Sequence, residues 1–169
     1  GEGLLRSFND MHGLDYVALR YFNVYGPRMD VFGKYTEVFI RWMECFDRGE
    51  RPKIFGDGKQ TMDFVEVTDV ARANIAAMRS GLTDSIVNVA SGTETSLLQL
   101  LEALARANGL PGADPQFCEE RKVNPVPRRL ADVGRMRAEL GMTSTIPLDR
   151  GLRNFVAWYR EEKRSAAAR

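Results

Sequence analysis

The amino-acid sequence predicts an α/β fold, and three observations support that class. Short runs rich in β-branched and aromatic residues alternate with longer segments whose apolar residues recur at helical spacing. Glycine, proline and asparagine separate these segments, as they do at turns. The chain of 169 residues, 44% of them hydrophobic, is long enough to bury a core without a disulfide or a metal ion. Strands separated by helices are typical of a largely parallel sheet.

The chain begins inside a segment with helical spacing. Its apolar residues are Leu4, Leu5, Phe8 and Met11. Gly13 follows them as a helix C-cap would. Because the first residue is Gly rather than Met, we expect the chain to be part of something larger. A β-rich run at 16–22 then predicts a strand, and residues 23–28, which contain a Gly-Pro pair, predict a loop.

The middle of the chain repeats the alternation of strand and helix. An apolar stripe predicts a helix at about residues 36–48, with Thr36 as its N-cap and Gly49 as its stop. The strands expected next are at 53–55, 63–67 and 86–90, with a glycine turn at 56–58 and a helix at 69–80.

The last third is predicted to be mostly helical. Ser96 and Gln99 have the spacing of a capping box, which predicts a leucine-rich helix that ends at Asn108. An edge strand is expected at 116–118, and two further helices are expected at about 131–140 and 148–163.

Composition excludes several classes of function. The 24 Lys and Arg residues balance 23 Asp and Glu residues, so the net charge of +1 gives no reason to expect a nucleic-acid partner. No apolar run approaches the roughly 18 residues that a membrane span requires, so no membrane partner is expected. Two cysteines and one histidine cannot build the usual zinc site, and reduced thiols favour a cytoplasmic location.

Common catalytic motifs do not occur in the sequence. No Gly-x-Gly-x-x-Gly turn follows a strand, and no Walker loop or Gly-x-Ser-x-Gly elbow is present. Tyr159 and Lys163 match the pattern Tyr-x-x-x-Lys, in which a lysine lowers the pKa of a tyrosine. Four-residue patterns recur by chance, and we expect a core tyrosine beside a solvated lysine.

Five segments carry a resemblance to a known family. They are LRYFNVYGPR at 19–28, IFGDGKQTMDFV at 54–65, VTDVA at 67–71, NVASG at 88–92 and RLADV at 129–133. In order and spacing they resemble the extended short-chain dehydrogenase/reductases that modify nucleotide sugars, above all the enzymes similar to UDP-glucose 4-epimerase. The resemblance runs from residue 1 to about 160 and covers only the back half of such an enzyme.

The resemblance implies a fold and a cofactor. The expected fold is the back part of a Rossmann-type parallel sheet plus the smaller α/β substrate-binding domain. Residues 1–34 would be the tail of the dinucleotide-binding domain. Residues 35–165 would mainly form the nucleotide-sugar-binding domain, with some elements returning to the Rossmann sheet. NAD would be held mainly by a preceding part that carries the glycine-rich turn and the catalytic Tyr-x-x-x-Lys, so no catalytic residue is expected in this chain. The resemblance also implies a homodimer joined partly through the first helix.

Asn23 is the first candidate for substrate binding. It follows a strand at its carboxyl end, where open α/β sheets bind ligands, and its amide can bond a pyrophosphate or sugar oxygen. An asparagine that only holds its own turn is the alternative. The resemblance places Tyr21, Phe22 and Val24 near the nicotinamide, although apolar residues at a strand end are equally typical of a core.

Further substrate contacts are expected in the next helix and strand. Tyr35 and Thr36 open the helix, whose N-terminal amides can face an anion or a base edge, although Thr36 can equally serve only as a cap. By resemblance, Phe55 packs on the uracil ring, and the backbone of Lys53 and Phe55 reads its edge. A phenylalanine buried in a core is the alternative for Phe55.

The sequence departs from the family where positive charge is usual. Met62 stands where relatives often carry an arginine that clamps the pyrophosphate or ribose. Downstream, Lys122 takes the place of a second arginine, and a lysine lacks the bidentate fork of a guanidinium. The missing charge could be supplied by Arg121, Arg128 or Arg28. The alternative for Arg128 is a solvated surface position.

These features predict the nucleotide-sugar-binding portion of an NAD-dependent UDP-sugar 4-epimerase. The intact enzyme would oxidise a sugar hydroxyl to a keto intermediate and reduce it on the other face, while this chain alone would be inactive. Three alternatives remain: a dehydratase or decarboxylase of the same family, a catalytically silent binding protein, and a structural fragment.

Overall fold

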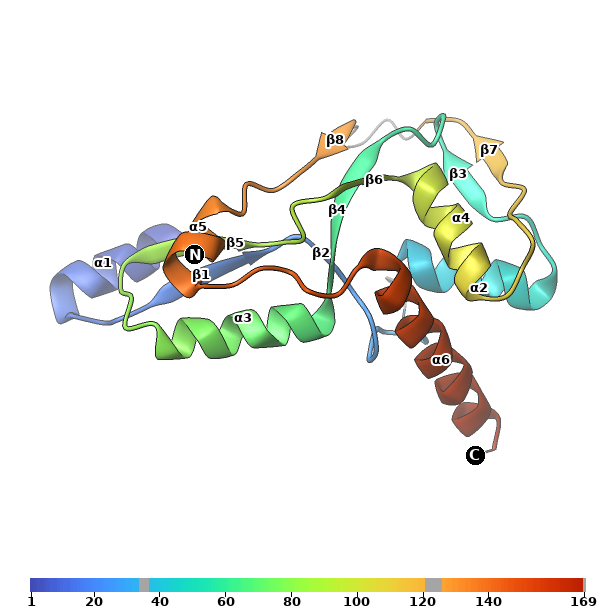
Figure 1. The fold of residues 1–169 in the computed structure, drawn as a ribbon. Coiled ribbons are helices and arrows are strands. Elements are labelled where there is room, and N and C mark those ends of the chain that lie inside the picture. The colour runs from blue at the N-terminus through green and yellow to red at the C-terminus, as the bar shows by residue number, and fades with distance from the viewer. Residues whose placement is uncertain (34–36, 121–125, 169) are drawn as a thin grey trace.

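The structure is a computed structural model that describes residues 1–33, 37–120 and 126–168 (Figure 1). It confirms the α/β class. The helices are α1 (Glu2–His12), α2 (Val38–Arg48), α3 (Val67–Arg79), α4 (Leu97–Ala107), α5 (Gly134–Leu140) and α6 (Leu148–Ala167). The strands are β1 (Val17–Tyr21), β2 (Asn23–Tyr25), β3 (Lys53–Phe55), β4 (Thr61–Glu66), β5 (Ser85–Val89), β6 (Glu94–Ser96), β7 (Gln116–Cys118) and β8 (Arg128–Arg129). None of the helices within the described ranges is long and apolar enough to cross a membrane.

Most strand pairs are parallel. β1 pairs with β5 along its whole length, and β3 pairs with β7, which is the predicted edge strand. β4 is the most connected strand, because it pairs with β2 and β8 in parallel and with β6 in the antiparallel sense. The pairs come from segments far apart in the sequence, so long-range contacts determine this arrangement.

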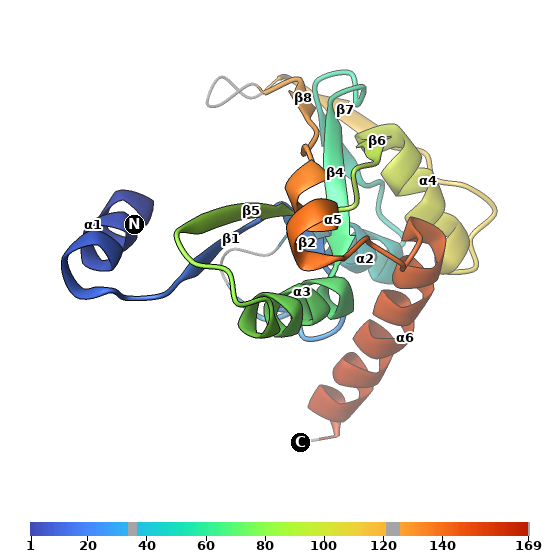
Figure 2. The ribbon, with the colours of Figure 1, turned by 60° about the vertical axis from the view of Figure 1, so that its left-hand side comes forward.

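The buried side chains form two clusters. One lies between β1, β5, α3 and α5 and includes Val65, Val87 and Met136. The other gathers under α2, α4 and α6 and includes Phe39, Phe64 and Phe155. In Figures 1 and 2, α1 lies at the far end of the molecule from α2, α4 and α6, and none of its residues is buried.

Local signals set several helix ends as predicted. Ser96 accepts a hydrogen bond from the Gln99 backbone, and the Gln99 side chain bonds back to Ser96, which confirms the capping box. Gly13 and Gly49 end α1 and α2 in the left-handed conformation. The N-cap of α2 is Glu37 rather than the predicted Thr36, which lies outside the described residues.

The predicted loop at 23–28 was partly wrong. Its first residues form β2, because the backbone of Asn23–Tyr25 pairs in parallel with Phe64–Glu66 of β4. The strands β6 and β8 were not predicted either. Such short strands have no periodicity of their own and are defined only by the β4 residues beside them.

Two buried carboxylates tie distant loops to the sheet. Asp63 in β4 accepts hydrogen bonds from the Ser91 backbone at 2.8 Å, the Ser91 hydroxyl at 2.6 Å and the Gly92 backbone at 2.9 Å. Asp69 at the start of α3 accepts from the Ser144 hydroxyl at 2.8 Å and from the segment that leads into α6. Both carboxylates are at most 1% exposed, and their bonds compensate for burial of the charge.

Candidate functional site

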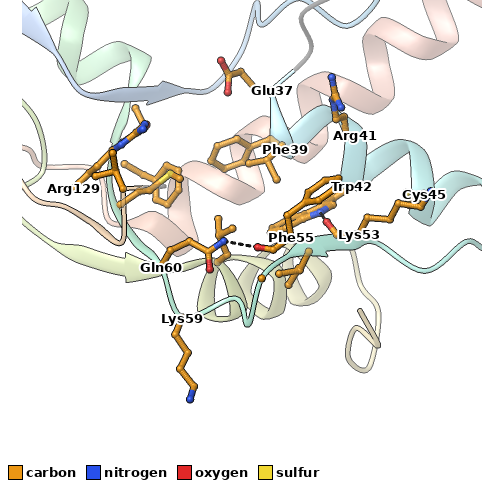
Figure 3. Close-up of a pocket in the computed structure, with 18 of the residues that line it drawn as sticks. Glu37, Phe39, Arg41, Trp42, Cys45, Lys53, Phe55, Lys59, Gln60 and Arg129 are labelled. Atoms are coloured by element: carbon orange, nitrogen blue, oxygen red, sulfur yellow. Dashed lines mark hydrogen bonds between the residues drawn. The ribbon is translucent and has the colours of Figure 1, made fainter. Parts of the chain in front are cut away.

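A large open pocket lies between α2, β3 and the strands around β4 (Figure 3). Its wall includes the junction of β1 and β2, the inner face of α2, the turn after β3 and the end of β8. The carboxyl end of β1 opens into it, which is where open α/β sheets place their ligands. The pocket therefore has the position that the sequence predicted for substrate.

Asn23 lies in the wall of this pocket at the start of β2. Its side-chain amide donates a hydrogen bond of 2.9 Å to the backbone oxygen of Asp63 in β4. That bond orients the amide at the junction of two strands, so the side chain serves the neighbouring strand rather than its own turn. Phe22 and Val24 line the same wall. Tyr21 does not, because its hydroxyl donates to Asn74 of α3 at 2.9 Å.

β3 turns alternate residues to opposite sides. All three residues contribute to the pocket wall, but Ile54 is buried at 1% exposure, whereas Lys53 and Phe55 are exposed. The Trp42 indole donates to the Lys53 carbonyl at 3.1 Å, and the Gln60 amide donates to the Phe55 carbonyl at 2.8 Å (Figure 3). These bonds hold the backbone of β3 in place, with the Phe55 ring at 36% exposure beside it.

The cationic residues predicted to contact the phosphates lie either away from the pocket or outside the described residues. Arg28 and Arg128 do not line the pocket. The Arg128 guanidinium instead makes a bidentate bond to Glu94 at 2.8 and 3.0 Å. Tyr35, Thr36, Arg121 and Lys122 lie outside the described residues.

Sequence reasoning missed Arg129, which lines the pocket together with Met62. Adjacent residues of an extended strand face opposite sides, and Arg128 turns toward Glu94 while Arg129 turns toward the pocket. The sequence signal was present as the Arg-Arg pair, but choosing between the two requires the pairing of β8 with β4.

The pair Tyr159 and Lys163 has the structural role that was expected. Tyr159 is 1% exposed and donates a hydrogen bond of 2.9 Å to Asp47. Burial and this bond raise the pKa of Tyr159 above its ordinary value. A tyrosine that acts as a base needs the opposite shift. Lys163 lies 3.9 Å from Glu44 and cannot reverse the effect.

The described wall carries groups that can bind a ligand. It contains aromatic rings, amides and charged groups, while no histidine, serine or tyrosine occurs among its described residues. Burial raises the pKa of the Cys45 thiol in the wall, which disfavours the reactive thiolate. The apolar side chains of Phe22 and Val24 fit the face of an aromatic ring such as nicotinamide.

Comparison with known proteins agrees with this picture. The family model described as "NAD dependent epimerase/dehydratase family" matches residues 1–90. UDP-glucose 4-epimerase of Mycolicibacterium smegmatis is 35% identical over 162 residues, which cover 96% of this chain and 51% of that protein. UDP-N-acetyl-α-D-glucosaminuronate decarboxylase of Bacillus cytotoxicus is 30% identical over 156 residues, which cover 89% of this chain and 48% of that protein.

A solved structure extends the likeness to three dimensions. UDP-glucose 4-epimerase of Thermotoga maritima, crystallised with UDP-glucose, matches with a TM-score of 0.88 and 35% identity. The match covers 96% of this chain and 51% of that protein, and it confirms the predicted Rossmann-type α/β fold. The chain spans about half the length of the curated relatives it matches.

Proposed function

Because the chain belongs to the NAD-dependent epimerase/dehydratase family, we propose that it is the nucleotide-sugar-binding portion of an NAD-dependent UDP-sugar 4-epimerase. The observation that carries the proposal is that Asn23 and Phe55, from separate strands, line one pocket. The amide of Asn23 can bind a polar group, and the exposed ring of Phe55 can stack on an aromatic base, so the pocket suits a ligand that carries both.

In this proposal the uracil ring packs on Phe55. Stacking of a base on an aromatic side chain contributes about 1–3 kcal/mol. The fixed backbone of Lys53 and Phe55 reads the edge of the base, and Asn23 contacts the pyrophosphate or the sugar. Tyr35, Thr36, Arg121 and Lys122 are the further substrate contacts that the sequence predicts, whereas Arg128 is held by Glu94 and does not line the pocket.

The chemistry of the intact enzyme is assigned to residues upstream of this chain. NAD, when bound, supplies a hydride acceptor and donor, and Tyr21, Phe22 and Val24 are proposed to lie near its nicotinamide. The present residues hold the nucleotide while the sugar is processed, so this chain alone is inactive. Residues 1–34 are assigned to the dinucleotide-binding domain and residues 35–165 mainly to substrate binding.

The proposal also includes the assembly and location of the protein. Leu4, Phe8 and Met11 on α1 are 63%, 46% and 74% exposed, and this apolar surface supports a homodimer joined through α1. The free thiols of Cys45 and Cys118 are compatible with a cytoplasmic enzyme.

Catalysis by the intact protein tests the reaction. We expect the purified protein to contain NAD and to interconvert UDP-glucose and UDP-galactose, measured by chromatography of the nucleotide sugars. A keto-deoxy sugar or released CO₂ from a UDP-sugar would instead establish a dehydratase or decarboxylase. Tight UDP binding without any turnover would establish a silent binding protein.

A pair of phenylalanine variants tests the site. Phe55→Ala should weaken UDP binding by about 1–3 kcal/mol, because the base loses its stacking partner. The matched control is Phe117→Ala. Phe117 lies beside β3 in β7 and is 56% exposed, but it does not line the pocket. Equal loss of UDP affinity in both variants would contradict the assignment of Phe55.

A further inference from the structure

The pocket proposed to hold a nucleoside diphosphate needs a cation for the phosphates, and Met62 in its wall carries no charge. The partner of Met62 on the neighbouring strand is Arg129, because β8 pairs with β4 in the register Met62↔Arg129. Both residues line the pocket. The pairing of strands therefore brings a guanidinium to the place where β4 itself offers only a thioether.

Arg129 differs from Arg48, Lys59 and Arg128 in that no described residue partners its guanidinium. Arg48 pairs with Glu50 at 3.0 Å, and Lys59 lies 3.8 Å from Asp57. Arg128 is held by both oxygens of Glu94. Within the described part of the chain, the Arg129 guanidinium makes no hydrogen bond or ion pair, so it is available to a bound anion.

The pleat of β8 explains why the two arginines differ. Arg128 pairs in register with Thr61, and both side chains bond to Glu94 on one side of β4. Arg129 and Met62 consequently face the other side, which is the pocket. Figure 3 shows Arg129 across the pocket from Phe55 and Lys53, with Lys59 extending away from the other labelled side chains.

We propose that Arg129 binds the diphosphate of the nucleotide sugar from β8, in place of a charge on β4 at Met62. This inference rests on the proposed function. With the base on Phe55, the phosphates would extend across the pocket toward Arg129. A guanidinium can bond two phosphate oxygens at once, and such charge-assisted pairs are the stronger kind of hydrogen bond. Arg129 is thus a substrate-binding residue rather than a catalytic one.

Calorimetric titration of the intact protein with UDP and with uridine tests the proposal. Arg129→Gln should raise the dissociation constant for UDP about tenfold or more and leave that for uridine nearly unchanged, since uridine has no phosphate. The matched control is Arg128→Gln, which changes the neighbouring arginine on the opposite face and should bind UDP as the unchanged protein does. Thermal unfolding of each variant verifies that it is folded.

A double variant tests whether the positive charge can be moved from β8 to β4. Adding Met62→Arg to Arg129→Gln should restore most of the UDP affinity, because the two positions are partners in register. This rescue would not follow if Arg129 acted only through folding.

Several results would overturn the proposal. It fails if Arg129→Gln weakens UDP and uridine binding equally, or if it leaves UDP binding unchanged. In these cases the unchanged protein still binds UDP, so the proposed function stands. If the unchanged protein, loaded with NAD, binds neither UDP nor uridine, the proposed function itself is wrong and this inference falls with it.

Discussion

Gly151 in α6 lies against the ring of Tyr25, and replacing it with alanine should destabilise the protein. A Cβ atom on Gly151 would lie 2.1 Å from the Tyr25 hydroxyl oxygen and 2.8 Å from Cζ of the ring. Both distances are far below van der Waals contact. Tyr25 cannot easily move away, because it is 1% exposed and its ring stacks on Phe39 with 5.1 Å between centroids.

The expected effect combines two opposing contributions. Alanine in a helix is favoured over glycine by about 1 kcal/mol. Overpacking of a close-packed core costs about 1–3 kcal/mol, and the short distances at Gly151 place this case at the upper end. We therefore expect Gly151→Ala to lower the free energy of unfolding by about 2 kcal/mol.

Gly3→Ala is the matched control for the Gly151 substitution. Gly3 lies within α1, and a Cβ there would meet nothing within 4 Å, so the same change should be neutral or slightly stabilising. Urea unfolding followed by circular dichroism measures both variants. Tyr25→Phe should reduce the loss, because it removes the nearest atom and costs only a long bond of 3.4 Å to the Leu148 carbonyl. The reasoning is refuted if Gly151→Ala and Gly3→Ala unfold at the same urea concentration.

Other perturbations test the site, a buried carboxylate and the assembly. Asn23→Ala should weaken UDP-sugar binding by about 1–3 kcal/mol in titration calorimetry. Asn88→Ala, which also removes an amide-to-backbone bond but does not line the pocket, should not weaken it. Burial alone would raise the pKa of Asp69, but hydrogen bonds from its neighbours outweigh it and hold the pKa below the ordinary value of 3.8. The ionised form therefore stabilises the fold above about pH 4, and this stabilisation is lost as the pH falls through the lowered pKa. Asp69→Asn should cost about 3 kcal/mol at pH 7 and show a smaller fall in its urea midpoint below pH 4. A midpoint that falls equally in both proteins would contradict this role. Phe8→Glu should convert the proposed homodimer into a monomer in light scattering, whereas an unchanged protein that is already monomeric at micromolar concentration would refute the dimer.

Elements with local signals could be predicted from the sequence, and elements made by long-range pairing could not. α4 was predicted with both ends because its capping box and its leucine spacing lie within the helix itself. For β2 the sequence predicts a loop, because Asn23–Tyr25 becomes a strand only beside β4. The two residues of β8 have no periodicity to detect.

The same distinction holds for the site. The sequence indicated Asn23 and Phe55 because each lies in a segment that resembles the family, and the structure brings both to one pocket. The sequence indicated Arg128 rather than Arg129. Which of these two side chains faces the pocket is determined by the register of β8 with Thr61 and Met62 of β4. Charge can be counted in a sequence, but the side of a sheet on which a short strand places it depends on a partner strand.

β4 belongs to both hydrophobic clusters of the protein. Phe64 packs in the cluster under α2, α4 and α6, while the next residue, Val65, packs in the cluster with β5 and α3. A single inserted or deleted residue in β4 would send each of these side chains to the wrong cluster. The two cores therefore cannot be separated into independently folding pieces by a cut between them. Recombination with a relative should keep β4 and the three strands paired with it, β2, β6 and β8, from the same parent.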